Sequence, residues 1–109
     1  MTKKSRGNRM KMYRQGDILL IATDKKRHTL GPVQDRKVLA EGEVTGHLHE
    51  IQGDKATLYG DSPETLLLEV AELSELTHDE HSTILIEPGF YRVVRQREYT
   101  PEGERMVID

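Results

Sequence analysis

Cysteine and tryptophan are absent from this chain of 109 residues, and aromatic residues make up only 5% of it. Without cysteine the chain can form no disulfide bond, zinc–thiolate site or iron–sulfur cluster, and thiol catalysis is excluded. The longest apolar runs, residues 18–22 and 65–68, fall far below the roughly 20 residues that a membrane span needs. No apolar stretch follows the basic N-terminus before Ile18, so we expect a cytoplasmic protein with no signal peptide and no membrane contact.

Charge is divided unevenly along the chain. Residues 1–55 hold twelve Lys and Arg against seven Asp and Glu, whereas residues 56–109 hold four against twelve. The most basic block predicts an N-terminal arm over residues 1–12, either a disordered tail or an arm that binds nucleic acid. The acidic second half argues against wrapping a long duplex. It still allows a small anionic ligand, a single strand, or head-to-tail contact between subunits.

Short apolar clusters separated by turn residues predict a single all-β domain over residues 13–109. The expected strands cover residues 17–23, 36–41, 46–52, 55–59, 65–73, 83–87, 89–99 and 105–108. About eight short strands in one small chain favour a small barrel or a sandwich. Gly53-Asp54 predicts a hairpin between two of them, and the capping-box spacing of residues 77–80 predicts one short helical turn within residues 73–81.

The five histidines include two close pairs, His47 with His49 and His78 with His81. Side chains alternate along a strand, so His47 and His49 should share one face, about 6–7 Å apart by the strand rise. Leu48 should point the other way and anchor the strand in the core. Two imidazoles at this spacing suit two different chemistries, and the sequence does not say whether the two pairs meet.

The first chemistry is metal-independent cleavage of a phosphodiester. His47 and His49 would form an acid–base pair, one taking a proton from a ribose 2′-hydroxyl and the other protonating the leaving oxygen. Arginine forks suit phosphate oxygens, and tyrosines can stack on bases. The substrate would be held by four side chains: Tyr13, Arg14, Gln15 and Arg95. We therefore predict a phosphodiesterase or ribonuclease that needs no cofactor and acts on RNA or a cyclic oligonucleotide.

The second chemistry is metal binding. A strand H-x-H pair with a third histidine from a later loop is a common site for zinc, iron, manganese or nickel. The pair resembles the H-x-H motif of cupins, which is followed by a strand with a Pro-Gly turn and another histidine. Here Pro88-Gly89 supplies the turn, Tyr91 stands near the ligand position, and the glutamate expected after His49 is missing. Either His81 or His78 could supply the third ligand, and the alternative prediction is a cupin-like metal site built from His47, His49 and His81.

The chain resembles a group of small bacterial and phage proteins in three motifs: YRQGD at residues 13–17, EGEVTGHLH at 41–49 and PGFYRVVRQREY at 88–99. This likeness covers residues 12–109. In size the chain is similar to the ring nucleases of type III CRISPR defence, which degrade cyclic oligoadenylate without a metal. That resemblance implies a role in antiviral defence.

A third possibility is a non-enzymatic adaptor that docks a partner through the acidic segment of residues 61–80. For the chain as a whole we expect a homodimer, because pairing gives a small barrel both a larger core and a cleft.

Overall fold

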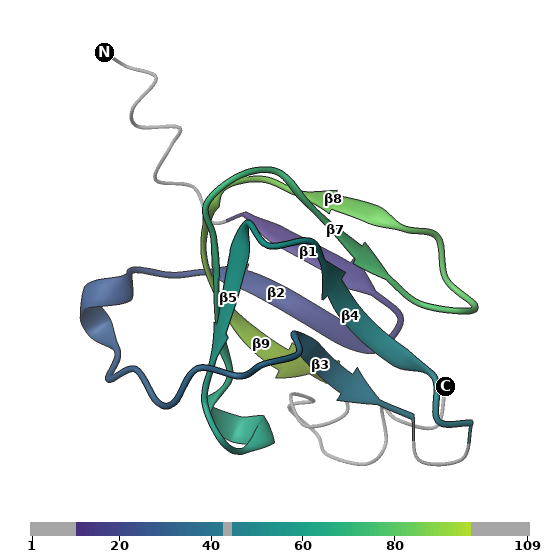
Figure 1. Ribbon diagram of the computed structural model, residues 1–109, viewed down its shortest axis with the longest axis horizontal. Helices are drawn as coiled ribbons and strands as arrows, with labels where there is room; N and C mark the ends of the chain where they lie inside the picture. Colours follow the sequence, from purple (N-terminus) through teal and green to yellow (C-terminus); the bar gives the residue numbers. More distant parts are fainter. Residues whose placement is uncertain (1–10, 43–44, 97–109) are drawn as a thin grey trace.

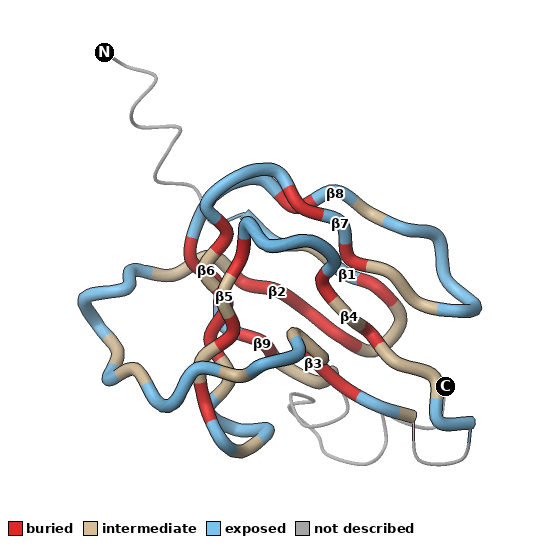
Figure 2. Tube along the Cα trace, in the orientation of Figure 1, coloured by how far each residue is buried: buried red, intermediate tan, exposed pale blue. Residues whose placement is uncertain are grey.

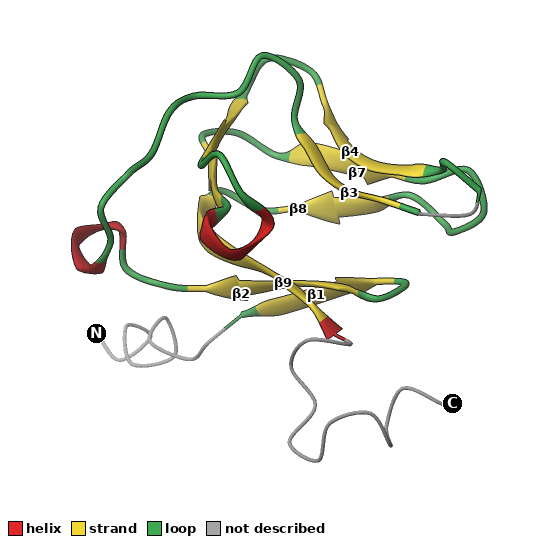
Figure 3. Cartoon of the chain, turned by 90° about the horizontal axis from the view of Figure 1, so that it is seen from below, coloured by secondary structure: helices red, strands yellow, loops and turns green. Residues whose placement is uncertain are grey.

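The computed structural model describes residues 11–42 and 45–96, and this part of the chain folds into two antiparallel sheets (Figures 1 and 3). Its strands are β1 (Met12–Gln15), β2 (Ile18–Ala22), β3 (Val38–Glu41), β4 (Leu48–Gln52), β5 (Ala56–Tyr59), β6 (Leu67–Val70), β7 (Ser74–Thr77), β8 (Ile84–Ile86) and β9 (Gly89–Arg95). One sheet has the order β1-β2-β9-β6-β5 and the other has the order β3-β4-β7-β8. The all-β prediction is confirmed, as a sandwich rather than a closed barrel.

The core lies between the two sheets, and Figure 2 shows buried residues along strands of both. Strand alternation produces this arrangement: in β7, Ser74 and Leu76 are buried while Glu75 is exposed. Both sheets contribute to one apolar cluster, which includes Ile18, Leu20, Leu39, Ile51, Leu58, Leu68, Leu76, Ile86, Tyr91 and Val93. Burial of these side chains supplies the main driving force for packing the sheets together.

Most of the expected strands overlap observed ones, since β2 to β6, β8 and β9 all lie within the predicted ranges. The expected strand at residues 105–108 and the end of the 89–99 strand lie outside the described residues. The short helical turn predicted within residues 73–81 is wrong, because β7 occupies residues 74–77 and pairs with both β4 and β8. Single 3-10 turns occur instead at η1 (Lys25–Arg27) and η2 (Pro63–Thr65).

The hairpin predicted at Gly53-Asp54 is also wrong. The strands on either side of it belong to different sheets, because β4 pairs with β3 and β7 whereas β5 pairs with β6. Gly53, with a φ of 89°, therefore lies where the chain crosses from one sheet to the other.

A hairpin that the sequence pattern did not indicate joins β1 to β2 through Gly16 and Asp17. Gly16 has a φ of 62°, as the first central residue of a two-residue hairpin turn often does. β1 begins at Met12, the last residue assigned to the basic arm, and residues 1–10 of that arm lie outside the described residues. In residues 11–42 and 45–96, no helix has the length and apolarity to cross a membrane.

Candidate functional site

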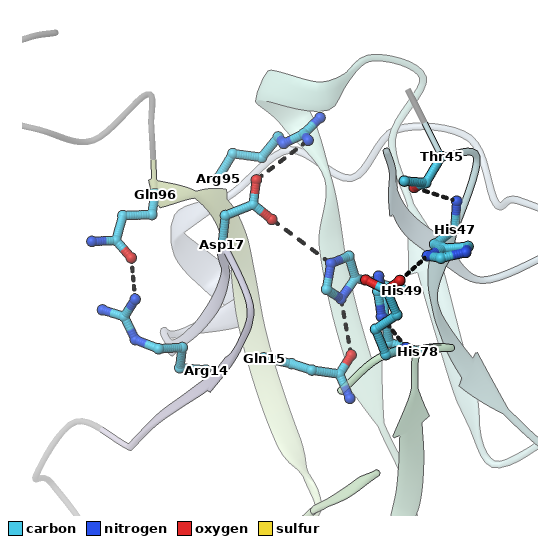
Figure 4. Close-up of polar contacts among 10 residues, drawn as sticks. Arg14, Gln15, Asp17, Thr45, His47, His49, His78, Arg95 and Gln96 are labelled. Atoms are coloured by element: carbon cyan, nitrogen blue, oxygen red, sulfur yellow. Dashed lines mark hydrogen bonds and ion pairs between the residues drawn. The ribbon is translucent and has the colours of Figure 1, made fainter. Parts of the chain in front are cut away.

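The two histidine pairs meet in the structure, and Figure 4 shows three of the four residues, His47, His49 and His78. His47 directly precedes β4 and His49 lies within it, while His78 and His81 lie in the loop between β7 and β8. His78 is the central ring: its centroid lies 4.2 Å from that of His49, 4.5 Å from that of His81 and 5.6 Å from that of His47. We call these four residues the histidine cluster. Pairing of β4 with β7 places the two segments next to each other.

His49 is the buried member of the cluster, with 5% of its surface exposed. It shares the inner face of β4 with Ile51, and Leu48 on the other face is only half-buried. The prediction that Leu48 anchors this strand in the core is therefore wrong, because the register of β4 turns the histidine inward instead.

A buried amide fixes the orientation of the His49 ring. The side-chain Nε2 of Gln15 donates hydrogen bonds to the carbonyl oxygens of Leu76 and Ser82, both at 2.9 Å. The amide oxygen of Gln15 is thus the acceptor for His49 Nδ1, which lies 2.9 Å away. In its neutral form His49 carries its proton on Nδ1, which leaves the lone pair of Nε2 available for a proton or a metal ion.

Burial lowers the pKa of His49 from its ordinary value to about 4, and the neighbouring His78, His81 and Arg95 lower it further, against the attraction of Asp17. At neutral pH the ring is therefore uncharged. Burial and the nearby His81 and His47 also lower the pKa of His78. Its Nδ1 accepts a hydrogen bond from the backbone N–H of Glu80 at 3.0 Å, so neutral His78 carries its proton on Nε2.

Three carboxylates lie close to the cluster. An oxygen of Asp17 is 3.7 Å from His49 Nε2, while Asp79 and Glu80 lie 3.6 and 3.7 Å from the two ring nitrogens of His47. His47 Nδ1 is buried and makes no hydrogen bond within the described part of the chain. The surroundings of the cluster are therefore acidic.

Gly16 leaves the space that two of the rings occupy. A Cβ atom at this position would lie 2.7 Å from His81 Nε2 and 3.2 Å from His49 Cε1, and the φ of 62° disfavours any side chain. The β1–β2 turn thus passes directly against His49 and His81. It also carries Asp17 to the same place.

The structure brings some of the predicted site residues together and separates others. Gln15 contacts His49, and an Nη atom of Arg95 lies 3.4 Å from Asp17, beside the cluster. Arg14 is exposed and donates a hydrogen bond to Gln96, turned away from the histidines (Figure 4).

Tyr13 also lies away from the histidines, with its hydroxyl accepting a hydrogen bond from the Glu87 N–H and its ring packed edge-on against Tyr91. Sequence reasoning missed Gly16 and Asp17. The signal available in the sequence was the Gly-Asp pair itself, because both residue types are common in tight turns.

The cluster is not arranged to hold a metal ion as its side chains lie: the described residues contain no group of three or more His, Asp or Glu with that geometry. The spacing of the rings is nevertheless close to that of a metal site. Imidazoles bound tetrahedrally at about 2.0–2.1 Å have ring centroids roughly 5 Å apart. The ring centroids of His49 and His81 lie 5.9 Å apart, near that value, whereas the shorter separations of 4.2 and 4.5 Å both involve His78.

The acidic segment of residues 61–80 does not form one continuous face. It contributes β6 to one sheet and β7 to the other, and it buries Leu67, Leu68 and Leu76. Its carboxylates are therefore divided between different parts of the surface.

Comparison with known proteins relates this chain to others through its family alone. No curated protein and no solved structure matches it. Residues 14–96, which contain the β1–β2 turn and all four residues of the cluster, match one protein family. The chain belongs to the family described as "Domain of unknown function (DUF8820)".

Proposed function

We propose that the histidine cluster binds a divalent transition-metal ion. The observation that supports this most is the meeting of four imidazoles from two separate segments, one of them buried with its Nε2 lone pair unused. Acidic neighbours favour a cation over an anion at this place. Imidazole and carboxylate ligands without thiolates suit zinc, iron, manganese or nickel.

The ligands that fit best are His47, His49 and His81. His49 offers Nε2, and the amide of Gln15 supports its other nitrogen, as hydrogen-bond acceptors commonly do for metal-binding histidines. His81 is exposed and His47 is half-buried, so both rings have room to turn toward a common point. Asp17 is the nearest carboxylate for a further position, whereas His78 keeps its Nε2 proton and would donate a hydrogen bond.

Metal content tests the proposal directly. Protein purified without a His tag would be analysed by mass spectrometry and titrated calorimetrically with Zn²⁺, Mn²⁺, Fe²⁺ and Ni²⁺. We expect one ion per chain and a loss of affinity of about tenfold or more in His49→Ala and His81→Ala. The control is His28→Ala, because His28 bonds Thr23 and packs near Phe90, away from the cluster. Absence of stoichiometric binding, or an equal loss in the control, would contradict the proposal.

A second candidate is the metal-independent phosphodiesterase acting on RNA or a cyclic oligonucleotide. The observation in its favour is that neutral His49 can accept a proton while Arg95 lies close enough to meet a phosphate. His47 would be the proton donor. The candidate ranks second because Arg14 lies away from the site and because Asp17 and two further carboxylates would repel a phosphate.

A cleavage assay separates the two candidates. Labelled linear RNA and cyclic oligoadenylates would be incubated with the protein in EDTA and, in parallel, with divalent metals. Cleavage that survives EDTA and disappears in His47→Ala would support acid–base catalysis by the histidines. Cleavage only with added metal would place the same residues in a coordination sphere. No cleavage under either condition would rule out the nuclease.

A further inference from the structure

A separate cavity of about 410 Å³ lies between β3 of one sheet and β9 of the other. Much of its wall is apolar, formed by Leu39, Ala40 and Val93 together with the half-buried Val38 and Leu66. A volume of this size falls within the range of small-molecule sites, which combine apolar walls with a few polar groups.

Among the described residues that line this cavity, Arg95 alone is positively charged. Its side chain is 19% exposed, and within the described residues its Nε atom is buried without a hydrogen-bond partner. The contact to Asp17, at 3.4 Å, uses a different nitrogen and is long for a charge-assisted hydrogen bond. Nε itself is closed off from the cavity, so a ligand oxygen would reach Arg95 through the part of its side chain that stays exposed.

We propose that this cavity binds a small organic acid whose anionic group pairs with Arg95 and whose apolar part lies against β3 and β9. The site does not depend on the metal proposed for the histidine cluster. It requires only the cavity and the exposed part of the Arg95 side chain.

The charges at the cavity set the kind of acid. Arg95 offers one positive charge, while Glu41 and Asp61, both exposed, also line the cavity. A second negative charge on the ligand would meet these carboxylates and would be repelled. A carboxylate with a neutral apolar body therefore fits better than a molecule with several negative groups.

The position of Arg95 also connects the cavity to the histidine cluster. One oxygen of Asp17 lies 3.4 Å from Arg95, and the other lies 3.7 Å from His49 Nε2. An acid held by Arg95 would share this guanidinium with Asp17, since arginine has five donors. The ligand would thus lie next to the cluster, where it could meet a metal ion or a reacting group.

The test is a titration of metal-free protein, in EDTA and Tris buffer, followed by NMR of backbone amides and the Arg95 Nε–H signal. The probe is benzoate, with benzyl alcohol as its uncharged counterpart. We expect benzoate to shift the Arg95 Nε–H and the amides of Leu39, Ala40 and Val93. The Kd for benzyl alcohol should be higher by about tenfold or more, because this molecule lacks the charge that pairs with the guanidinium.

Two variants and a control make the result decisive. Arg95→Gln should raise the Kd for benzoate about tenfold or more, whereas Arg92→Gln should not, since Arg92 lies on the opposite face of β9. Val38→Phe, which keeps Arg95 but fills part of the cavity, should also abolish binding. The proposal is overturned if benzoate shifts none of these signals, if benzyl alcohol binds equally well, or if Arg95→Gln binds like the unaltered protein. Because no metal is present, each of these results is independent of the metal proposal.

Discussion

At the scale of single residues, the chemistry of the cluster depends on an amide that touches no solvent. Gln15, 3% exposed, links β1 to the other sheet through Leu76 and Ser82 and orients His49 with its remaining atom. A glutamine in this position selects the tautomer of the histidine, because both of its amide hydrogens are already used. Gln15 is thus a positioning residue rather than the substrate contact that its place in the YRQGD motif suggested.

Gln15→Leu should therefore change the tautomer of His49 as well as stability. Two buried groups, the Leu76 carbonyl and His49 Nδ1, and the part-buried Ser82 carbonyl would lose their partner. The loss should lower the free energy of unfolding by roughly 2–3 kcal/mol. In ¹⁵N NMR the His49 ring should change from the Nδ1–H form to a mixture of tautomers. Gln52→Ala is the control, since Gln52 is exposed and its side chain donates a hydrogen bond to Thr77 rather than to the cluster. A Gln15→Leu variant that retains the Nδ1–H form would refute this role.

Gly16→Ala and Gly53→Ala separate backbone strain from steric exclusion. Both glycines have a positive φ, so each substitution should cost roughly 1–2 kcal/mol of unfolding free energy. Only at Gly16 would the added Cβ meet His81 and His49, whereas nothing lies within 4 Å at Gly53. We expect both variants to lower the melting temperature. Gly16→Ala alone should shift the NMR signals of the two rings, and equal ring shifts in both variants would contradict the steric argument.

At the scale of elements, a strand is easier to predict from the sequence when more of its own residues are apolar and buried. β2 carries an unbroken apolar run, Ile18 to Ala22, and is evident from the sequence. β7 has only Ser74 and Leu76 on its inner face, and its hydrogen bonds come from β4 and β8, which are distant or later in the chain. Local signals at residues 77–80 therefore indicated a helical turn that tertiary pairing overrides.

The histidine cluster was predictable in part for the same reason. The spacing of His47 and His49 is local, and the strand expected over residues 46–52 contains β4, with His49 inside it and His47 just before it. The approach of His78 and His81 depends on the pairing of Ile51 with Leu76, which no local pattern specifies. The burial of His49 instead of Leu48 depends on the register of β4, because a slip of one residue would turn Leu48 inward and His49 outward.

The turn between β8 and β9 is held by the Tyr91 hydroxyl, which donates a hydrogen bond to the Glu87 carbonyl at 2.6 Å. Burial is the main cause that raises the pKa of this phenol, so it stays protonated and continues to donate. Tyr91→Phe should lower the free energy of unfolding by about 1–2 kcal/mol, because the carbonyl loses its partner while the ring packing remains. Chemical denaturation measures this loss, and an unchanged midpoint would show that the bond adds no net stability.

At the scale of the whole molecule, the buried histidine makes stability depend on pH. The folded pKa of His49, about 4, lies below the ordinary value of 6.5, so between these values the unfolded chain binds more protons than the folded one. Stability should therefore fall as the pH is lowered from 6.5 toward 4, by roughly 2–3 kcal/mol from this group. Urea denaturation in EDTA at several pH values would show the slope. His49→Gln should flatten it, and a slope equal to that of the unaltered protein would contradict the assignment.

Homodimer formation stays a prediction. Within residues 11–42 and 45–96, four large apolar residues are well exposed: Met12, Val33, Leu73 and Leu85. A second copy would be one way to cover some of them. Light scattering after size-exclusion chromatography should give about twice the mass of the chain at micromolar concentration. A single-chain mass at every concentration would exclude the dimer.

The strand order has a consequence for how the chain reaches its native state. β2 pairs with β9, so that Ile18 lies opposite Arg95. Contacts between residues so far apart in the sequence form late in folding. Such a high contact order predicts slow folding, because long loops must close before pairing is rewarded. Gly16 and Asp17 come from one sheet, and the four histidines come from the other and its connecting loop. An intermediate with only one sheet formed would expose apolar strands and would lack either the histidines or the Gln15, Gly16 and Asp17 that lie against them. Ligand capture would therefore distinguish native chains from kinetically trapped ones.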